Sequence, residues 1–515
     1  MKYVVRGAGA WVIASLSSFL SLVAFDVQGQ ALTTDLGPKR TFEIIPRLAL
    51  SETWTDNVRA GGVDKQVDQI TEISPGIQIR AESARLKGNL DYAATKINYL
   101  NNSSSNQLQN ALNAFGRMEA VDNFFFIDAS GQISQQSISA FGTQTAVNTS
   151  INSNQTEVSN YSFSPSFRGR ITDSANYEAR WTRSILGSKS DLRSGLGQTD
   201  LLLNINGNTA VKGLAWSVGT SRQTVGFSEG RPTEADRTIF GMVYALTPQV
   251  NINASRGLDS NNYSSLEKES QASSGIGFNW IQSERTTVSG SMDQRSFGRL
   301  HSLNFDHRTG RTAWKITDSK SVTTSPNQIA VGSLGSIYDI LYSQFSTIEP
   351  NPGARVQLVN SYLQTNNINP NSQVLTPFLI SGQTITRRQD AIFALLGARS
   401  TVTFLASQTR SQRLDSLSNA IDDYSSESSI EQRGFSINYS HRLTPEMTFS
   451  ALASFQKVIG VDTSAGESTS LVSFNVTKIL ASRSNVSAGF RRVNYSGIST
   501  FGHEAAVSIN LNILF

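Results

Sequence analysis

Apolar and polar residues alternate over most of the chain. In the segment FEIIPRLAL, at 42–50, every second residue is apolar. The same period of two returns in ISPGIQIRAE at 73–82 and in HEAAVSINLNILF at 503–515. This period is typical of a β-strand with one apolar and one polar face. Each alternating segment has about 9 to 13 residues, which is long for a soluble protein and typical of a tilted strand that crosses a membrane.

Short and long connections alternate along the chain between these segments. The short ones are built from turn residues, for example SA at 83–84, VDN at 121–123 and TDS at 172–174. The long ones are polar and include 136–158 and 412–430. This order predicts an all-β, transmembrane, antiparallel up-and-down β-barrel. Its tight turns are expected in the periplasm and its large loops outside.

We predict about 22 strands, an even number, as a bacterial single-chain barrel with both ends in the periplasm requires. Their approximate spans are 41–53, 70–82, 85–99, 108–120, 123–135, 159–171, 175–186, 199–208, 213–223, 237–247, 249–257, 273–282, 285–295, 300–308, 311–317, 387–396, 400–411, 431–442, 446–457, 467–479, 485–496 and 503–515. A soluble β-helix or a series of sandwiches is the alternative. Either would show shorter strands and, for the β-helix, a fixed repeat period that the sequence lacks.

The end of the chain is apolar on one face. That face consists of Val507, Ile509, Leu511, Ile513 and Phe515. Because the last strand of a closed barrel pairs with the first, backbone hydrogen bonds are expected to hold this terminus. The final aromatic ring is expected in the interfacial girdle.

Residues 318–386 interrupt the alternation. The segment SIYDILYSQFSTI, at 336–348, spaces its apolar residues almost as a helix does, and Pro352 lies near a possible start of a second helix. A structureless loop of about 70 residues is unusual. We predict short amphipathic helices near 335–365 that either cap the outer mouth or fold into the lumen. A surface subdomain without a special role is the alternative.

The N-terminus has the pattern of a secretory signal peptide over residues 1–30. Lys2 and Arg6 precede an uncharged, largely apolar stretch, and small residues follow it. Cleavage is predicted after Gly29 or Ala31, and a membrane-anchoring helix is the alternative. We expect Sec-type export, followed by a barrel domain over 40–515 in the outer membrane of a Gram-negative cell. About 10 residues separate the signal from the first strand, so no soluble plug is expected.

Composition excludes some chemistry. The chain has no cysteine, so disulfides, thiolate metal sites and cysteine nucleophiles are excluded. Charged residues make up 16% of the chain, below the roughly 25% of typical soluble domains. The net charge of +4 is spread over the whole chain and gives no reason to expect a nucleic-acid partner. We expect no cofactor and no bound metal.

Charged residues occur on the predicted inner faces of the early strands. The candidate lumen-lining residues are Arg80, Glu82, Asp91, Asp128, Arg168, Arg170, Glu178 and Arg180. Such a wall could line a polar conduit. Alternatively, opposite charges on neighbouring strands only neutralise one another across a wet lumen. The mixed signs argue against strong ion selectivity.

The chain has four histidines that are candidates for a catalytic base: His301, His307, His441 and His503. A lipase triad would need one of them beside a serine and an acid on the barrel wall. His307 stands next to Asp306 and Arg308 at a predicted turn, where a structural hydrogen bond is the simpler interpretation. The sequence contains no paired-histidine metal spacing and no phosphate loop. We therefore predict no catalytic residues.

Several segments together resemble a known family. They are LSETWTDNV at 50–58, ISPGIQIR at 73–80, LDYAATKINY at 90–99, FGRMEAVDNFFFIDASGQISQQ at 115–136 and FGRLHSLNFDHRTGRTAW at 297–314. They are similar to outer-membrane barrels associated with the PEP-CTERM/exosortase system of Gram-negative bacteria. The C-terminal strand also resembles the signal read by the barrel-assembly machinery.

The resemblance implies a non-enzymatic role in exopolysaccharide export or in production of a biofilm matrix. The partners it implies are outer-membrane lipid, the assembly machinery, exopolysaccharide and proteins of the export system. A general porin for small polar solutes is one alternative. A surface adhesin or hydrolase that acts through its extracellular loops is another.

Overall fold

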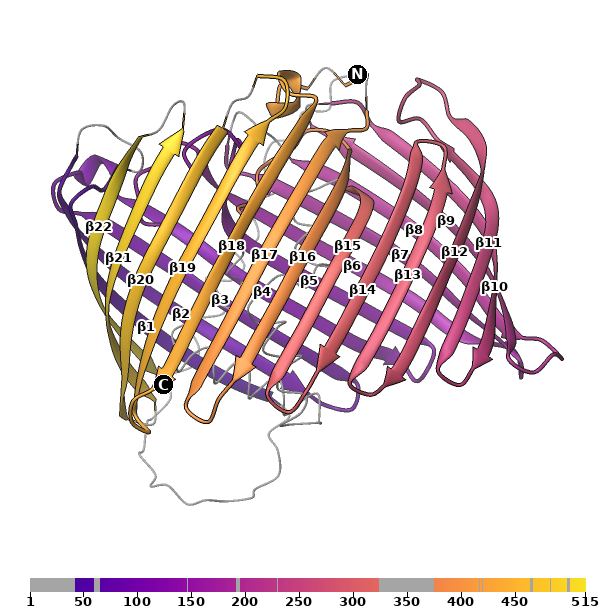
Figure 1. Ribbon diagram of the computed structural model, residues 1–515, viewed down its shortest axis with the longest axis horizontal. Helices are drawn as coiled ribbons and strands as arrows, with labels where there is room; N and C mark the ends of the chain where they lie inside the picture. The colour runs from indigo at the N-terminus through magenta and orange to yellow at the C-terminus, as the bar shows by residue number, and fades with distance from the viewer. Residues whose placement is uncertain are drawn as a thin grey trace. The chain divides into compact units, whose positions relative to one another are not determined.

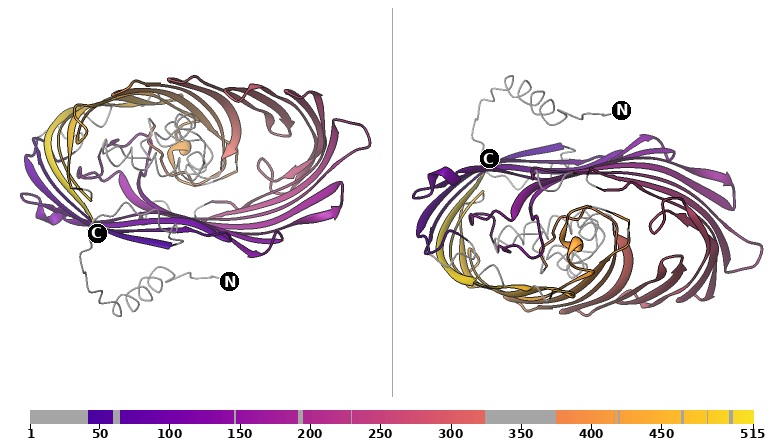
Figure 2. Two further views of the ribbon diagram at one scale, coloured as in Figure 1. Left: turned by 90° about the horizontal axis from the view of Figure 1, so that it is seen from below. Right: turned by 90° about the horizontal axis from the view of Figure 1, so that it is seen from above.

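The computed structural model describes residues 42–59, 65–145, 147–190, 195–228, 230–323, 375–415, 417–418, 420–463, 466–481, 483–497 and 501–515. Within these residues, 22 strands form one antiparallel sheet in which each strand pairs with its neighbours in the sequence. The first strand also pairs with the last, so the sheet closes into a barrel. Figure 1 shows the tilted strands and Figure 2 looks along the barrel. The predicted fold class and strand number are confirmed.

The strands are β1 Phe42–Thr55, β2 Asp68–Glu82, β3 Leu86–Tyr99, β4 Gln107–Val121, β5 Phe125–Ser137, β6 Gln155–Thr172, β7 Ala175–Ser188, β8 Leu196–Asn208, β9 Leu214–Phe227, β10 Thr233–Thr247, β11 Val250–Asn261, β12 Glu269–Ser283, β13 Thr286–Arg295, β14 Gly298–Arg308, β15 Thr312–Thr323, β16 Thr384–Leu396, β17 Ser400–Arg413, β18 Ser429–Arg442, β19 Met447–Gly460, β20 Gly466–Ala481, β21 Ser484–Gly497 and β22 Phe501–Leu514. Two short 3₁₀ helices, η1 Ser103–Ser105 and η2 Asp423–Ser425, lie in connections.

The terminal strands close the barrel. Pairing runs from Arg47 opposite Leu514 to Thr55 opposite Ala506. The backbone N–H of Phe515 then donates to the carbonyl of Pro46 at 2.9 Å. The terminus is therefore held by the first strand, as the alternation predicts. A closed sheet leaves no strand edge to face lipid, where an unpaired backbone group would cost several kcal/mol.

The apolar side of the alternation faces outward. Phe42 and Ile44 of β1 are 53% and 52% exposed, and Val507 and Ile509 of β22 are exposed on the same outer surface. Large apolar side chains exposed in this way run along the outside of strands all around the ring. A belt of this kind is stable only in contact with lipid. The chain is therefore an outer-membrane β-barrel.

Five of the short connections have the same local irregularity, a β-bulge. The register shifts by one residue just before or at five of them: between Glu119 and Val121, Arg170 and Thr172, Ala245 and Thr247, Ile281 and Ser283, and Ile479 and Ala481. A bulge at this position increases the local twist and lets a short turn join long strands. In one of these turns Asn123 has a φ of 51°, a conformation that asparagine tolerates better than most residues.

The boundaries of the predicted insert were wrong. Residues 318–323 belong to β15 and residues 384–386 belong to β16. The outer face of β15 becomes polar here, with Asp318 and Lys320 in the positions that follow Trp314 and Ile316. Apolar alternation therefore stops while strand pairing continues. The predicted helices near 335–365 and the predicted signal peptide lie outside the described residues.

The described part of the chain contains no helix that is both long and apolar enough to cross a membrane.

Candidate functional site

The inner wall of β1–β3 carries paired charges. Arg47 of β1 donates from Nη1 to the Asp91 carboxylate of β3 at 3.1 Å, reaching across β2. It passes over Gly76, where an added Cβ would lie 2.7 Å from Arg47 Nε and 2.8 Å from the Tyr92 carbonyl. Glycine is thus required at 76 for this bridge. Beside it, Arg80 lies 3.8 Å from Glu43, its cross-strand partner.

A longer chain of charges follows on β4–β7. Asp128 accepts from Arg117 Nε at 2.5 Å and from Arg180 Nη1 at 2.9 Å. Arg180 continues to Glu178 at 2.9 Å, and Glu178 lies 3.4 Å from Arg168. The five residues alternate in sign, and every charge has an opposite neighbour. This wall is polar but nearly balanced in charge, so it offers hydrogen bonds without a strong field.

Six of the eight predicted lining residues therefore take part in these ion pairs. They are Arg80, Asp91, Asp128, Arg168, Glu178 and Arg180. Glu82 and Arg170 are exposed where their strands meet the short turns. Sequence reasoning missed Arg47, Arg117 and Glu43. Their positions on the polar face of β1 and β4 were visible, but which carboxylate each would reach depends on the register between strands.

Neutralising one carboxylate in this chain should change ion selectivity more than stability. In Asp128→Asn, the positive charges of Arg117 and Arg180 lose their shared partner. Pairs of this partial exposure contribute only about 0–1 kcal/mol, so the barrel should stay folded. The reversal potential in a salt gradient should shift toward anion preference. The same reversal potential in parent and variant would contradict an exposed lumen wall at this point.

Three connections fold inward at the end of the barrel that carries the long loops. We call the described residues of 138–154, 375–383 and 414–428, without 146, 416 and 419, the inner cap. They lie within the ring of strands in Figure 2, where η2 is the short orange coil. The second segment bonds to inward side chains: Thr376 N–H and Oγ1 each donate to Gln456 Oε1 at 3.0 Å, and Gln432 donates to the Thr376 carbonyl at 2.9 Å. The sequence places 375–383 in an insert that either caps the mouth or folds into the lumen, but it does not predict the inward course of 138–154 and 414–428.

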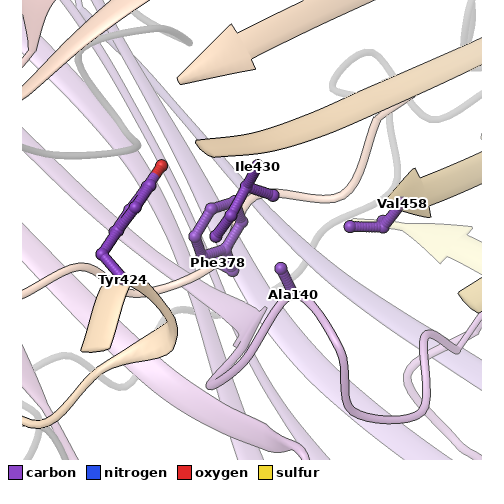
Figure 3. Close-up of a cluster of buried hydrophobic side chains, with 5 residues drawn as sticks. All are labelled: Ala140, Phe378, Tyr424, Ile430 and Val458. Carbon is purple, nitrogen blue, oxygen red and sulfur yellow. The ribbon is translucent and has the colours of Figure 1, made fainter. Parts of the chain in front are cut away.

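Apolar side chains join the three parts of the inner cap. Ala140, Phe378 and Tyr424 come from the three segments and pack with Ile430 and Val458 of the wall, as Figure 3 shows. The rings of Phe378 and Tyr424 are 6.4 Å apart. The pocket left between residues 375–378 and the inner wall measures about 40 Å³, enough for a few waters and too small for a sugar. The cap is therefore packed as a core is packed.

Two adjacent carboxylates anchor the inner cap. Asp423 accepts from Ser139 Oγ at 2.8 Å and from the Ala140 N–H at 2.7 Å. Asp422 accepts from the Ser381 N–H at 3.0 Å, caps η2 through the Tyr424 N–H, and forms an ion pair with Arg413 of β17. Both carboxylates are buried. They tie the 414–428 segment to the other two, and the sequence signal for them is the isolated IDDY within a serine-rich loop.

Two groups in the cap have shifted pKa values. The pKa of the Tyr424 hydroxyl is raised far above its usual range because the ring is buried, so Tyr424 stays neutral. Burial also acts to raise the pKa of Glu427, but hydrogen bonds from Thr463 and from the backbone of Asp462 outweigh it, and the net pKa is lowered. Glu427 therefore stabilises the fold above its usual pKa, and that contribution is lost as the pH falls through its depressed value.

Arg231 links the inner cap to a neighbouring loop. It pairs with Asp415, which is 1% exposed, at 2.9 Å. It also donates to the carbonyls of Asn262 at 2.5 Å and Ser265 at 3.0 Å. One guanidinium thus holds the 262–268 loop and the 414–428 segment together.

Removing this guanidinium should loosen the loop end without unfolding the barrel. Arg231→Ala leaves the Asp415 carboxylate buried and unpaired, a cost of about 3–5 kcal/mol to the local structure. We expect faster proteolytic cleavage within 262–268 at unchanged heat resistance of the strands. Arg183→Ala, an exposed arginine on the outer face of β7, is the control. Equal cleavage of both variants would mean that Arg231 does not hold the loop.

The histidines do not form a triad. His307 lies in β14, before the turn, and its Nδ1 is 2.8 Å from Thr286 Oγ1. His441 Nδ1 is 2.7 Å from Ser400 Oγ, but within the described residues no carboxylate bonds to this histidine. His301 pairs with Asp318 on the outer face. The described residues also contain no group of three or more potential metal ligands.

Comparisons with known proteins bear on the fold alone. No family model matches the chain, and no curated protein matches it. The solved structures that it resembles include the FrpB iron transporter from Neisseria meningitidis, with a TM-score of 0.49, 9% identity, and coverage of 93% of this chain and 82% of that one. The ferric enterobactin receptor PfeA from Pseudomonas aeruginosa gives a TM-score of 0.46 and 8% identity, with 92% and 80% covered. These likenesses carry no argument about cargo.

Proposed function

We propose that the chain is a non-enzymatic outer-membrane barrel that takes part in exopolysaccharide export or in production of a biofilm matrix. The observation that supports it most is the inner wall of β1–β7, where Arg47–Asp91 and the chain from Arg117 to Arg168 neutralise their charges in place. A neutral sugar chain needs many weak hydrogen bonds and little net field, because weak contacts at many sites permit movement. The resemblance to barrels of the PEP-CTERM/exosortase system supports the same cargo class.

The inner cap gives this proposal a gate. Its three segments are held inside the ring by buried carboxylates and an apolar cluster, and we propose that they move when polymer passes. Export through the barrel would then be conditional, with the cap in place when no polymer is being moved. Partner proteins of the export system are proposed to act from the periplasmic side, where the short turns lie.

A deletion strain tests the cargo. Loss of this chain should reduce the polysaccharide outside the cell, and the parent sequence should restore it. Purified barrel in a planar bilayer should show current that is interrupted by oligosaccharides of the same matrix. A strain that keeps its matrix and a current insensitive to oligosaccharides would instead favour the porin.

A second experiment deletes the stretch between β15 and β16, whose boundaries the structure gives. Deleting 324–374 leaves β15 and β16 whole, whereas deleting 318–386 would remove nine residues of their pairing. Comparing the conductance of the 324–374 deletion with that of the parent measures how far this stretch limits flow. A general porin without a gate would conduct equally in both forms.

A further inference from the structure

A row of cations crosses the outer face of β14–β17 at the end with the long loops. His301, Lys320, Arg387 and Arg410 stand on consecutive strands, and each lies directly opposite the next in the register. Two residues further toward the membrane on the neighbouring strands, Arg433 of β18 is opposite Lys457 of β19. We call Lys320, Arg387, Arg410, Arg433 and Lys457 the cationic row.

The alternation of the strands places this row outside the barrel. Lys320 shares its face of β15 with Trp314 and Ile316, which are exposed on the apolar belt. Arg387 is 49% exposed, whereas Asp390, on the other face of β16, is buried and belongs to the inner wall. Moving from Lys320 toward the short turns, the outer face reaches Ile316 within four residues. The row therefore lies at the border between the apolar belt and water, on the side of the long loops.

The row carries more positive charge than its neighbours neutralise. Arg387 pairs with Asp318, at 3.0 and 2.6 Å, and Arg433 pairs with Glu431. Within the described residues, Lys320, Arg410 and Lys457 form no ion pair, although Glu431 lies directly opposite Arg410 in the register. Like charges directly opposite one another on a sheet are destabilising. An external anion bound along the row would offset this repulsion.

The rim of β9–β12 shows what an internally balanced surface looks like. There Arg222 lies 3.3 Å from Glu234 and 3.5 Å from Asp236. Lys268 pairs with the same two carboxylates at 2.5 and 2.8 Å. Two cations and two acids satisfy one another completely, so this part of the rim needs no outside anion. The cationic row differs from this rim because three of its five cations form no ion pair within the described residues.

We propose that the cationic row binds the phosphate groups of a lipid in the outer leaflet. A lipid is favoured as the source of the anion because the apolar belt begins directly below the row. A phosphate held by Lys320, Arg387 and Arg410 would place the attached acyl chains on Ile316, Phe393 and Phe435, which lie on the same outer surface. Each lysine or arginine near a charged membrane surface adds to the attraction. This inference does not depend on the cargo of the lumen.

The test compares a triple variant and a double variant of the full chain in detergent. In the first, which we call the row variant, Lys320→Gln, Arg387→Gln and Arg410→Gln remove three of the five charges of the cationic row. In the second, Arg222→Gln and Lys268→Gln change the balanced rim. Purified protein is titrated with phosphorylated lipid A, with dephosphorylated lipid A and with inorganic phosphate, and bound lipid is counted by native mass spectrometry.

The parent and the balanced-rim variant should retain phosphorylated lipid A, and the row variant should bind it at least about tenfold more weakly. Dephosphorylated lipid A should bind weakly to all three, and inorganic phosphate should not displace the lipid. Arg387→Lys with Arg410→Lys should restore binding, and resistance to unfolding in detergent checks that each variant is folded. Equal binding by parent and row variant, or equal binding of the dephosphorylated lipid, would overturn the proposal.

Discussion

Replacing Asp422 and Asp423 together by alanine is expected to raise single-channel conductance several-fold. The first replacement leaves the Arg413 guanidinium buried without its partner, at a cost of about 3–5 kcal/mol. The second leaves the Ala140 N–H buried and unbonded, at about 1–3 kcal/mol. Together these costs approach the whole stability of a typical domain, about 5–15 kcal/mol, and they fall on the inner cap and its attachment to the end of β17. The cap should therefore open while the barrel remains.

Planar-bilayer recording of parent and double variant at equal salt measures this effect. Asp173→Ala is the matched control, since Asp173 is an exposed carboxylate in the short turn between β6 and β7, at the other end of the strands. The control should conduct as the parent does. If the double variant also conducts as the parent does, the carboxylates hold loops that do not obstruct flow, and the gating part of the proposal fails.

Deleting residues 501–515 is expected to abolish the folded barrel. The deletion removes β22 and leaves the edges of β1 and β21 without partners. Each unpaired backbone group facing lipid costs several kcal/mol, so no folded population should remain. The measurement is the mobility of unheated samples on denaturing gels, together with the β-sheet signal in circular dichroism. A compact, heat-sensitive band from the deletion would show that the ring does not need its last strand.

A single substitution separates this structural role from a role in targeting. Phe515→Ala keeps the strand and the backbone bond to Pro46. It should therefore refold in detergent as the parent does, yet accumulate less in the outer membrane, because the terminal aromatic is proposed to be read by the assembly machinery. Failure in both assays would mean that Phe515 serves stability only.

Alternation predicted every strand because every strand crosses lipid. Where the hydrocarbon ends, one face no longer has to be apolar, and the pattern fades before the pairing does. For this reason β6 begins at Gln155 and β12 at Glu269, about four residues earlier than the alternation indicates. The same cause hid the end of β15, where Asp318 and Lys320 replace apolar residues.

The candidate site was only partly predictable. The alternation of polar and apolar positions along the strands placed Asp128 and Arg180 on the inner face. The bridge from Arg47 to Asp91 could not be predicted in this way, because it depends on the register of three strands and on a glycine between the two residues. Of the inner cap, only the 375–383 segment lies in a stretch predicted to cap the mouth or enter the lumen, and the other two segments escaped prediction. Polar loop residues such as Asp423 look the same in sequence whether they meet water or a backbone N–H from a loop far along the chain.

The cap also has a mechanical consequence. The 138–154 segment leaves the wall from β5, and the 414–428 segment leaves it from β17, roughly half the ring away. The bonds from Asp423 to Ser139 and Ala140 therefore act as a cross-brace between opposite sides of the cylinder. Squeezing or stretching the cylinder sideways would strain this brace first. In the proposed gate, lateral tension in the surrounding membrane would act on the passage through these two bonds.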